Sequence, residues 1–254
     1  MGAGHAHALY VHEHSPLHRL PPHVKIVATF ATVVTVAVTP PEAWPVFGVA
    51  AAALLATARV ARVPVRFVAA RLAVVVPFLL MAATVPFVAS GPRVEFLGVR
   101  VSEPGLVAGG GIAARALLGA TSSILLVATT EVPRLLAGLE RLRLPAVLVQ
   151  IATFMVRYLE VVAGELGRMR RAMVARGHDP RWLWQARPLA AATGALFVRS
   201  YERGERVHTA MLARGYTGAM PPLREEPPVP AAVWAGALLL PAVVALALLT
   251  WTLR

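Results

Sequence analysis

The chain has 254 residues, of which 57% are hydrophobic and only 15% are charged, and its mean hydropathy is +0.64. Soluble domains carry about 25% charged residues, so this composition excludes an ordinary soluble protein and predicts an integral membrane protein. The formal net charge of +12 comes from arginines that lie between hydrophobic segments, which favours membrane topology and partner contact over nucleic-acid binding. Because there is no cysteine, disulfides, thiol catalysis and cysteine-ligated metals are excluded.

The first 23 residues are polar and rich in histidine, with His5, His7, His12, His14, His18 and His23. Imidazole binds divalent transition metals, so this tail is a candidate metal-binding segment. We favour the alternative of a flexible cytosolic tail without fixed ligand geometry, and we assign no metal ligand and no cofactor to the chain. No small-residue cleavage site stands out, so the first apolar run is expected to be a retained helix.

Five apolar segments are candidate transmembrane helices, which need ~20 residues to cross a bilayer core. In chain order they are Val24–Thr39, Trp44–Ala58, Leu72–Ala89, about Gly105–Thr130, and Ala231–Trp251. The first two are short for full spans, so tilt, local thinning of the bilayer or a tight helical hairpin is expected. Two internal prolines, Pro77 and Pro86, should kink the third.

The fourth segment contains the Gly109–Gly111 run and Arg115. An arginine inside the membrane is costly unless it is paired or faces protein, so Arg115 is a candidate functional charge. We favour the alternative that the span begins near residue 116 and that Arg115 lies at the headgroups. The glycines, together with Gly119, permit close contact with another helix, for example one of a partner subunit.

The placement of charge predicts the orientation of these spans. With the N-terminus inside, the inner side holds Arg59, Arg62, Arg66 and Arg71 and the whole basic region 131–226, whereas the outer side holds few charges, mainly in the 90–104 loop. Positive residues favour the cytoplasmic side, so the basic region is predicted to be cytoplasmic.

The basic region is predicted to be helical. A short helix with Pro133 in its first turn runs to about Arg141, a long helix opens after Pro145, and another starts near Pro188. The early part of the long helix, Ala146–Ala163, is interrupted by polar residues and is expected to lie at the membrane face or in a bundle, although it could form a sixth span. Residues 216–230, with five prolines, read as a linker to the last span.

A six-residue phrase occurs twice in this region, as Ala-Met-Val-Ala-Arg-Gly at 172–177 and Ala-Met-Leu-Ala-Arg-Gly at 210–215. Each copy is typical of a helix C-terminus, with glycine in the left-handed closing position. Small alanines permit close approach, methionines give adaptable apolar contacts, and arginine offers a forked donor for a carboxylate. Arg-Gly is a common helix ending, but two copies are much more specific. The candidate contact residues are Met173, Ala175, Arg176, Gly177, Met211, Ala213, Arg214 and Gly215.

Nearly the whole chain resembles the transmembrane T component of energy-coupling factor (ECF) transporters, and specifically the cobalt-type CbiQ branch. Besides the two Ala-Arg-Gly motifs, the resemblance is carried by Ser15–Lys25, by Thr39-Pro40, and by the stretch from Arg141–Pro145 through Phe154 and Arg157-Tyr158 to Arg170–Met173. The short first spans are the departure from the family pattern.

The resemblance implies that the two Ala-Arg-Gly helices dock on a pair of cytoplasmic ATP-binding-cassette (ABC) ATPases, with Arg176 and Arg214 pairing with acidic residues there. It also implies a substrate-capture membrane subunit, a cobalt-binding S component with or without a small accessory subunit, in the cell membrane of a prokaryote. Cobalt is the expected cargo, with nickel or a vitamin such as biotin as alternatives.

The predicted fold is therefore an all-α, polytopic membrane helical bundle of about five or six spans with a cytoplasmic coupling region. The predicted parts are a cytoplasmic tail at 1–23, a membrane domain of about four helices at 24–130, a coupling domain at 131–228 and a final span at 229–254. No catalytic set, phosphate-binding loop or His-Glu-x-x-His zinc motif is visible, so the chain is predicted to be non-catalytic. The competing classes are an intramembrane enzyme and a basic membrane scaffold that binds nucleic acid or anionic lipid.

Overall fold

The computed structural model describes residues 10, 11, 13, 15–96, 99–178, 187–218 and 228–253. In these ranges the chain is almost entirely helical, which confirms the predicted all-α class. It forms two compact units. One unit contains Ala8–Gly138 and Pro227–Arg254, the other contains Leu139–Glu226, and the boundary falls inside helix α7 (Val132–Arg141).

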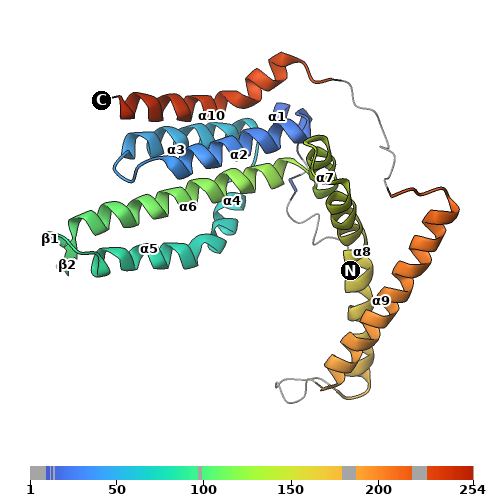
Figure 1. Cartoon of the computed structure of the whole chain (residues 1–254). Coiled ribbons are helices and arrows are strands. Elements are labelled where there is room, and N and C mark those ends of the chain that lie inside the picture. Colours follow the sequence, from blue (N-terminus) through green and yellow to red (C-terminus); the bar gives the residue numbers. More distant parts are fainter. Residues whose placement is uncertain are drawn as a thin grey trace. The chain divides into compact units, whose positions relative to one another are not determined.

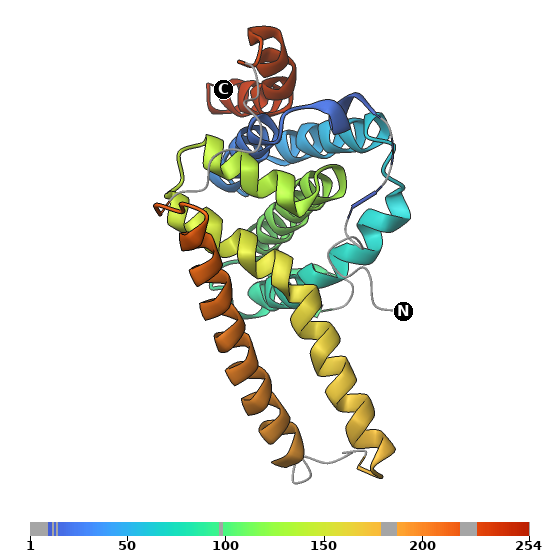
Figure 2. The ribbon, with the colours of Figure 1, turned by 90° about the vertical axis from the view of Figure 1, so that its right-hand side faces the viewer.

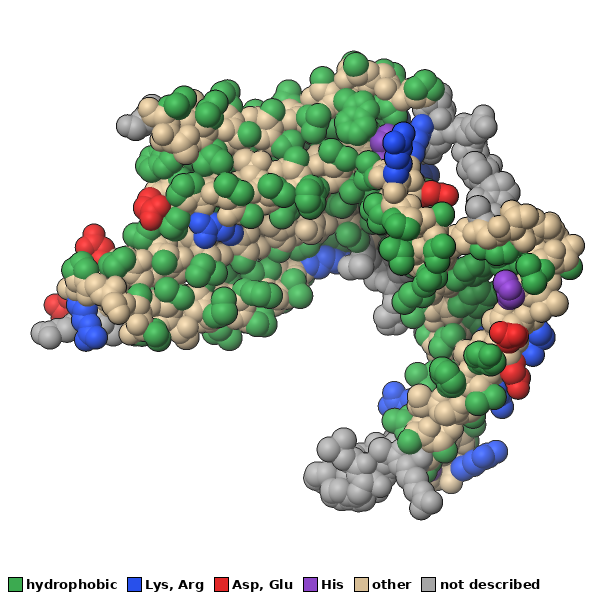
Figure 3. Space-filling model, in the orientation of Figure 1, with side chains coloured by type: hydrophobic (Ala, Val, Ile, Leu, Met, Phe, Trp, Pro, Cys, Tyr) green, Lys and Arg blue, Asp and Glu red, His purple; other side chains and the backbone are tan. Residues whose placement is uncertain are grey.

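The first unit, called the membrane unit below, is a bundle built around helix α6. Helix α6 contacts α2, α3, α4 and α5, and α10 packs on α2 and α3 (Figure 1). The face shown in Figure 3 is covered mostly by hydrophobic side chains with few charged groups between them. The elements are α1 (Pro16–Arg19), α2 (Pro22–Val38), α3 (Trp44–Val60), α4 (Val65–Arg71), the 3-10 helix η1 (Leu72–Val75), α5 (Val76–Val88), α6 (Glu103–Thr129) and α10 (Ala231–Thr252).

Four helical segments in the described ranges are long and apolar enough to cross a membrane: Val65–Val88, Glu103–Thr129, Ala146–Ala175 and Ala231–Thr252. Helices α2 and α3 are apolar but shorter. Together they make the chain a multi-pass integral membrane protein. For Ala146–Ala175, whose early part was expected at the membrane face or in a bundle with a sixth span as the alternative, the length and composition meet the criteria for that span.

The glycine run of α6 allows the short α2–α3 hairpin to pack closely against this helix. A Cβ at Gly110 would lie 2.5 Å from the Trp44 ring, and one at Gly111 would lie 2.6 Å from Pro41. On another side of the same helix, a Cβ at Gly109 would lie 2.6 Å from the carbonyl oxygen of Ala82 in α5. These glycines therefore permit close contact with other helices, as predicted, and the helices that they contact belong to the same bundle. The space beside Gly119 is open.

Arg115 is paired inside the bundle. Its Nη2 and Nε donate to the carbonyl oxygen of Thr39 at 2.6 and 3.2 Å, so the guanidinium caps the C-terminal end of α2. Because α6 begins at Glu103, Arg115 is an interior residue of the helix, whereas the depth of Arg115 relative to the headgroups stays a prediction. The cation is placed where the α2 dipole is negative and a carbonyl is otherwise left without a helical partner.

Two segments between α3 and α6 differ from prediction. Residues 65–71 were assigned to a basic connection but form α4, in which the Arg71 guanidinium lies 3.3 Å from the centre of the Phe67 ring. The 90–104 loop instead contains an antiparallel hairpin of β1 (Arg93–Phe96) and β2 (Val99–Ser102). The predicted kink near Pro77 corresponds to the 3-10 turn that precedes α5.

The second unit consists mainly of two long helices, α8 (Ala146–Ala175) and α9 (Arg187–Ala213), which lie side by side (Figure 2). Pro145 is the N-cap of α8, and α9 starts within one residue of the predicted Pro188. Most of the predicted linker, residues 219–227, lies outside the described residues.

Candidate functional site

Both copies of the repeated phrase close a helix with the same hydrogen bonds. At the end of α8, His178 N–H donates to Met173 O at 3.0 Å and Gly177 N–H donates to Val174 O at 2.9 Å. At the end of α9, Tyr216 N–H donates to Met211 O and Gly215 N–H to Leu212 O, both at 3.0 Å. This pair of bonds is the Schellman closure of a helix.

The glycines occupy the left-handed conformation that this closure requires. Gly177 has φ +78° and Gly215 has φ +82°, which confirms the predicted helix ends. No other group lies within 4 Å of the position that a Cβ would take at either glycine, so the requirement is one of backbone conformation and not of space.

The arginines at the two closures are available for contact. Arg176, Arg214 and the alanines before them, Ala175 and Ala213, are exposed, whereas Met173 and Met211 are half-buried. Within the described ranges neither guanidinium forms an ion pair with a carboxylate. Each closure therefore presents an exposed arginine that has no carboxylate partner among the described residues.

The two closures lie at opposite ends of the α8–α9 pair. Tyr216, just after α9, donates its hydroxyl to Oε1 of Gln150, near the start of α8, at 2.7 Å, so the helices run antiparallel. The helical path from Gln150 to Arg176 spans 26 residues, which at 1.5 Å per residue is about 40 Å. The two closures are therefore too far apart to form one compact site.

An ionic contact holds the helix pair together near its middle. Glu165 of α8, whose side chain is only 11% exposed, accepts from Arg199 Nη1 at 3.3 Å and from Arg203 Nη2 at 3.2 Å. The two arginines are four residues apart on α9 and therefore lie on one face. With two cations on one carboxylate, this contact fixes which faces of the helices meet.

Between Glu165 and Gln150 the helices line an open groove of about 510 Å³. Its walls are mainly apolar and aromatic, and include Ile151, Phe154, Tyr158, Val207 and Met211. Met211 of the second phrase lines the groove, whereas Met173 of the first phrase does not. The two copies are thus alike in backbone but differ in what their methionines contact.

Sequence reasoning missed Glu165, Arg199, Arg203, Gln150 and Tyr216. A carboxylate within a run of arginines on α8, facing two arginines spaced four apart, was an available signal for the ionic contact.

The histidine tail is only partly described. His5, His7, His12 and His14 lie outside the described residues. His18 and His23 are buried, so the expectation of a flexible tail is wrong for these two. His18 Nε2 lies 3.1 Å from Val11 O, which can only accept, and Nδ1 lies 2.7 Å from Ser15 Oγ. Nε2 therefore carries a proton and donates to this carbonyl. In the described residues no group of three or more metal-binding side chains occurs.

Comparison with known proteins agrees with the resemblance drawn from the motifs. Residues 13–228 match the model of the family CbiQ, cobalt transport protein. The cobalt transport protein CbiQ of Rhodobacter capsulatus is 34% identical over 168 residues, which cover 66% of this chain and 67% of that protein. The energy-coupling factor transporter transmembrane protein EcfT of Listeria innocua is 26% identical over 223 residues, covering 82% and 83%. The chain belongs to the CbiQ family of cobalt transport proteins, which are T components of ECF transporters.

Proposed function

We propose that this subunit transmits ATP-driven motion from a pair of cytoplasmic ABC ATPases, and that each of its two helix closures docks on one of them. The observation that carries the proposal is the pair of identical closures, each with an exposed arginine, about 40 Å apart on one helix pair. Arg176 and Arg214 are the docking cations, and the small residues beside them shape the contact. The positive-inside rule supports a cytoplasmic location for this unit and for the N-terminus.

A membrane-embedded substrate-capture subunit is the third partner. Large apolar side chains on the α8–α9 unit are exposed, for example Leu148 at 58%, Met155 at 67% and Phe197 at 70%. Exposed apolar residues in such number require cover by lipid or by another protein. In this proposal the present chain is non-catalytic, and its partners hydrolyse ATP.

Cobalt is the proposed cargo. The support is the description of the matched family and the name of the Rhodobacter capsulatus relative. Nickel or a vitamin such as biotin is the competing cargo within the same transporter class. Uptake of labelled cobalt and nickel by cells that express the complete complex, each challenged with an excess of the other ion, distinguishes them.

Charge reversal at both closures tests the docking role. The double variant Arg176→Glu, Arg214→Glu should insert normally but lose co-purification with the ATPases, because it places like charges against their acidic residues. The matched control is Arg168→Glu with Arg206→Glu, which changes the same charge on the same two helices away from their ends. If the double variant co-purifies with the ATPases as well as the control does, the docking assignment is wrong.

A further inference from the structure

The end of α6, where the chain leaves the bundle for α7, is closed by groups from the N-terminal segment. Residue Thr130 is extended, with φ −144° and ψ 123°, so α6 ends without a left-handed glycine. Val11 N–H donates to Ala128 O at 3.0 Å, and Lys25 Nζ donates to Thr129 O at 2.9 Å. Lys25 also donates to Thr130 Oγ1 at 2.8 Å. These donors satisfy carbonyls that a helix end otherwise leaves unpaired.

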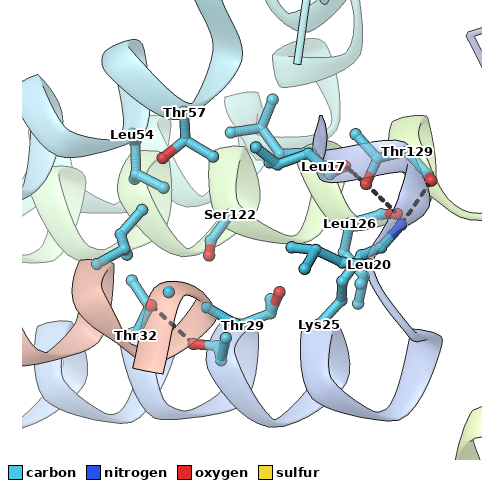
Figure 4. Close-up of a pocket in the computed structure, with 15 residues that line it drawn as sticks. Leu17, Leu20, Lys25, Thr29, Thr32, Leu54, Thr57, Ser122, Leu126 and Thr129 are labelled. Atoms are coloured by element: carbon cyan, nitrogen blue, oxygen red, sulfur yellow. Dashed lines mark hydrogen bonds between the residues drawn. The ribbon is translucent and has the colours of Figure 1, made fainter. Parts of the chain in front are cut away.

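Lys25 is an unusual residue for this position. It is only 7% exposed, and within the described ranges it forms no ion pair with a carboxylate. A buried ammonium without a counter-ion is costly. The two oxygens and the negative end of the α6 dipole offset that cost. Figure 4 shows the Lys25 ammonium against Thr129, while its stem lines a cavity of about 150 Å³ together with Leu17, Leu20 and Leu126.

The same first turn of α2 also holds α7. A Cβ at Gly138 of α7 would lie 2.9 Å from the backbone nitrogen of His23, 3.0 Å from Ile26 Cδ1 and 3.1 Å from the carbonyl carbon of Pro22. Only glycine permits this approach without displacing the backbone. Helix α7 continues beyond Gly138 into Leu139–Arg141, which belong to the α8–α9 unit.

We propose that the first turn of α2 is a clamp that fixes the junction between α6 and α7. Lys25 binds the end of α6, and the backbone of Pro22 and His23 packs against Gly138 of α7. With the junction fixed, displacement of the α8–α9 unit reaches the membrane helices. Without the clamp, the chain would bend at the extended residue Thr130, and the displacement would not reach α6. Lys25 and Gly138 are positioning residues, because neither belongs to the two helix closures that are assigned to docking. The role in transmission rests on the proposed function; the clamp itself does not.

The clamp is tested first in the isolated protein, by hydrogen exchange in detergent. Lys25→Met should raise exchange of residues 129–138 roughly tenfold, because charge-assisted hydrogen bonds to the end of α6 are lost. Lys25→Arg should restore most of the protection. Arg19→Met removes an exposed cation from the same segment and should change nothing. Equal exchange in Lys25→Met and Arg19→Met would overturn the clamp.

The role in transmission is tested in the complete complex, with cargo moved per ATP hydrolysed as the readout. Lys25→Met and Gly138→Leu should keep the ATPases bound and active but lower this ratio roughly tenfold. Arg19→Met, which removes an exposed cation from the same segment, is the control here too. An unchanged ratio despite faster exchange at 129–138 would overturn the role in transmission.

Two further outcomes separate the clamp from the proposed function. If Lys25→Met or Gly138→Leu does not fold, Gly138→Ala, which adds one methyl group, decides the question by the same two measurements. If the charge-reversed docking variant still binds the ATPases while Lys25→Met raises exchange, the docking proposal has failed and the clamp has not.

Discussion

Replacing the two closing glycines by alanine isolates the contribution of backbone conformation to the candidate site. At φ +78° and +82° an L-residue is less stable than glycine by roughly 1–2 kcal/mol. A Cβ meets nothing within 4 Å at either position, so no steric term is added. Each single variant, Gly177→Ala or Gly215→Ala, should therefore loosen its helix end by that amount. Because the two ends are far apart, the double variant should lose about 2–4 kcal/mol.

The expected readout is a weaker affinity for the ATPases by a factor of roughly 5 to 30 per closure, with faster hydrogen exchange confined to the last turn of the altered helix. Gly194→Ala is the matched control, since Gly194 lies in the interior of α9 with equally open space around it. There alanine should stabilise the helix by roughly 0.5–1 kcal/mol. If Gly215→Ala and Gly194→Ala give the same exchange and the same affinity, the closures do not depend on the left-handed conformation.

Two other substitutions test contacts that position the site and the bundle. Glu165→Gln should weaken the packing of α9 against α8, because an amide offers one neutral acceptor to two guanidinium groups. Hydrogen exchange in α9 should therefore rise. Glu202→Gln, which alters an exposed surface ion pair, should leave the exchange unchanged. Arg115→Met should destabilise the membrane unit by roughly 2 kcal/mol, because the Thr39 carbonyl loses a charge-assisted donor. The loss of stability would be measured as a lower melting temperature in detergent. A melting temperature equal to that of the unaltered protein would contradict the capping role.

The helix ends were the most predictable part of the site. The repeated phrase contains its own stop signal, because glycine after a helical run favours the left-handed closing residue. That local rule needs no knowledge of the tertiary fold, and both Gly177 and Gly215 follow it.

Contacts between distant segments were not predictable in the same way. Lys25 and Thr129 are 104 residues apart, and nothing in the sequence near either residue indicates the other. Arg115 gave a signal, a charge within an apolar helix, but its partner is a backbone carbonyl that any residue could have supplied.

Two local features were missed for different reasons. The third apolar segment was taken to begin at Leu72, which omits residues 65–71 with Arg66 and Arg71, yet an arginine side chain can lie along a helix, as Arg71 does over Phe67. The β1–β2 hairpin did have a signal, since Arg93–Phe96 and Val99–Ser102 alternate polar and apolar residues. Its strands of four residues are short, and the surrounding helices dominated the interpretation.

The ionic contact at Glu165 lies at unequal distances from the two ends of the helix pair. Along α8 the distance from Glu165 to Arg176 is about 16 Å, whereas the distance from Glu165 to Gln150, beside the other closure, is about 22 Å. A change in the angle between the two helices about this contact would therefore move the end beside Gln150 about a third farther than the end beside Arg176.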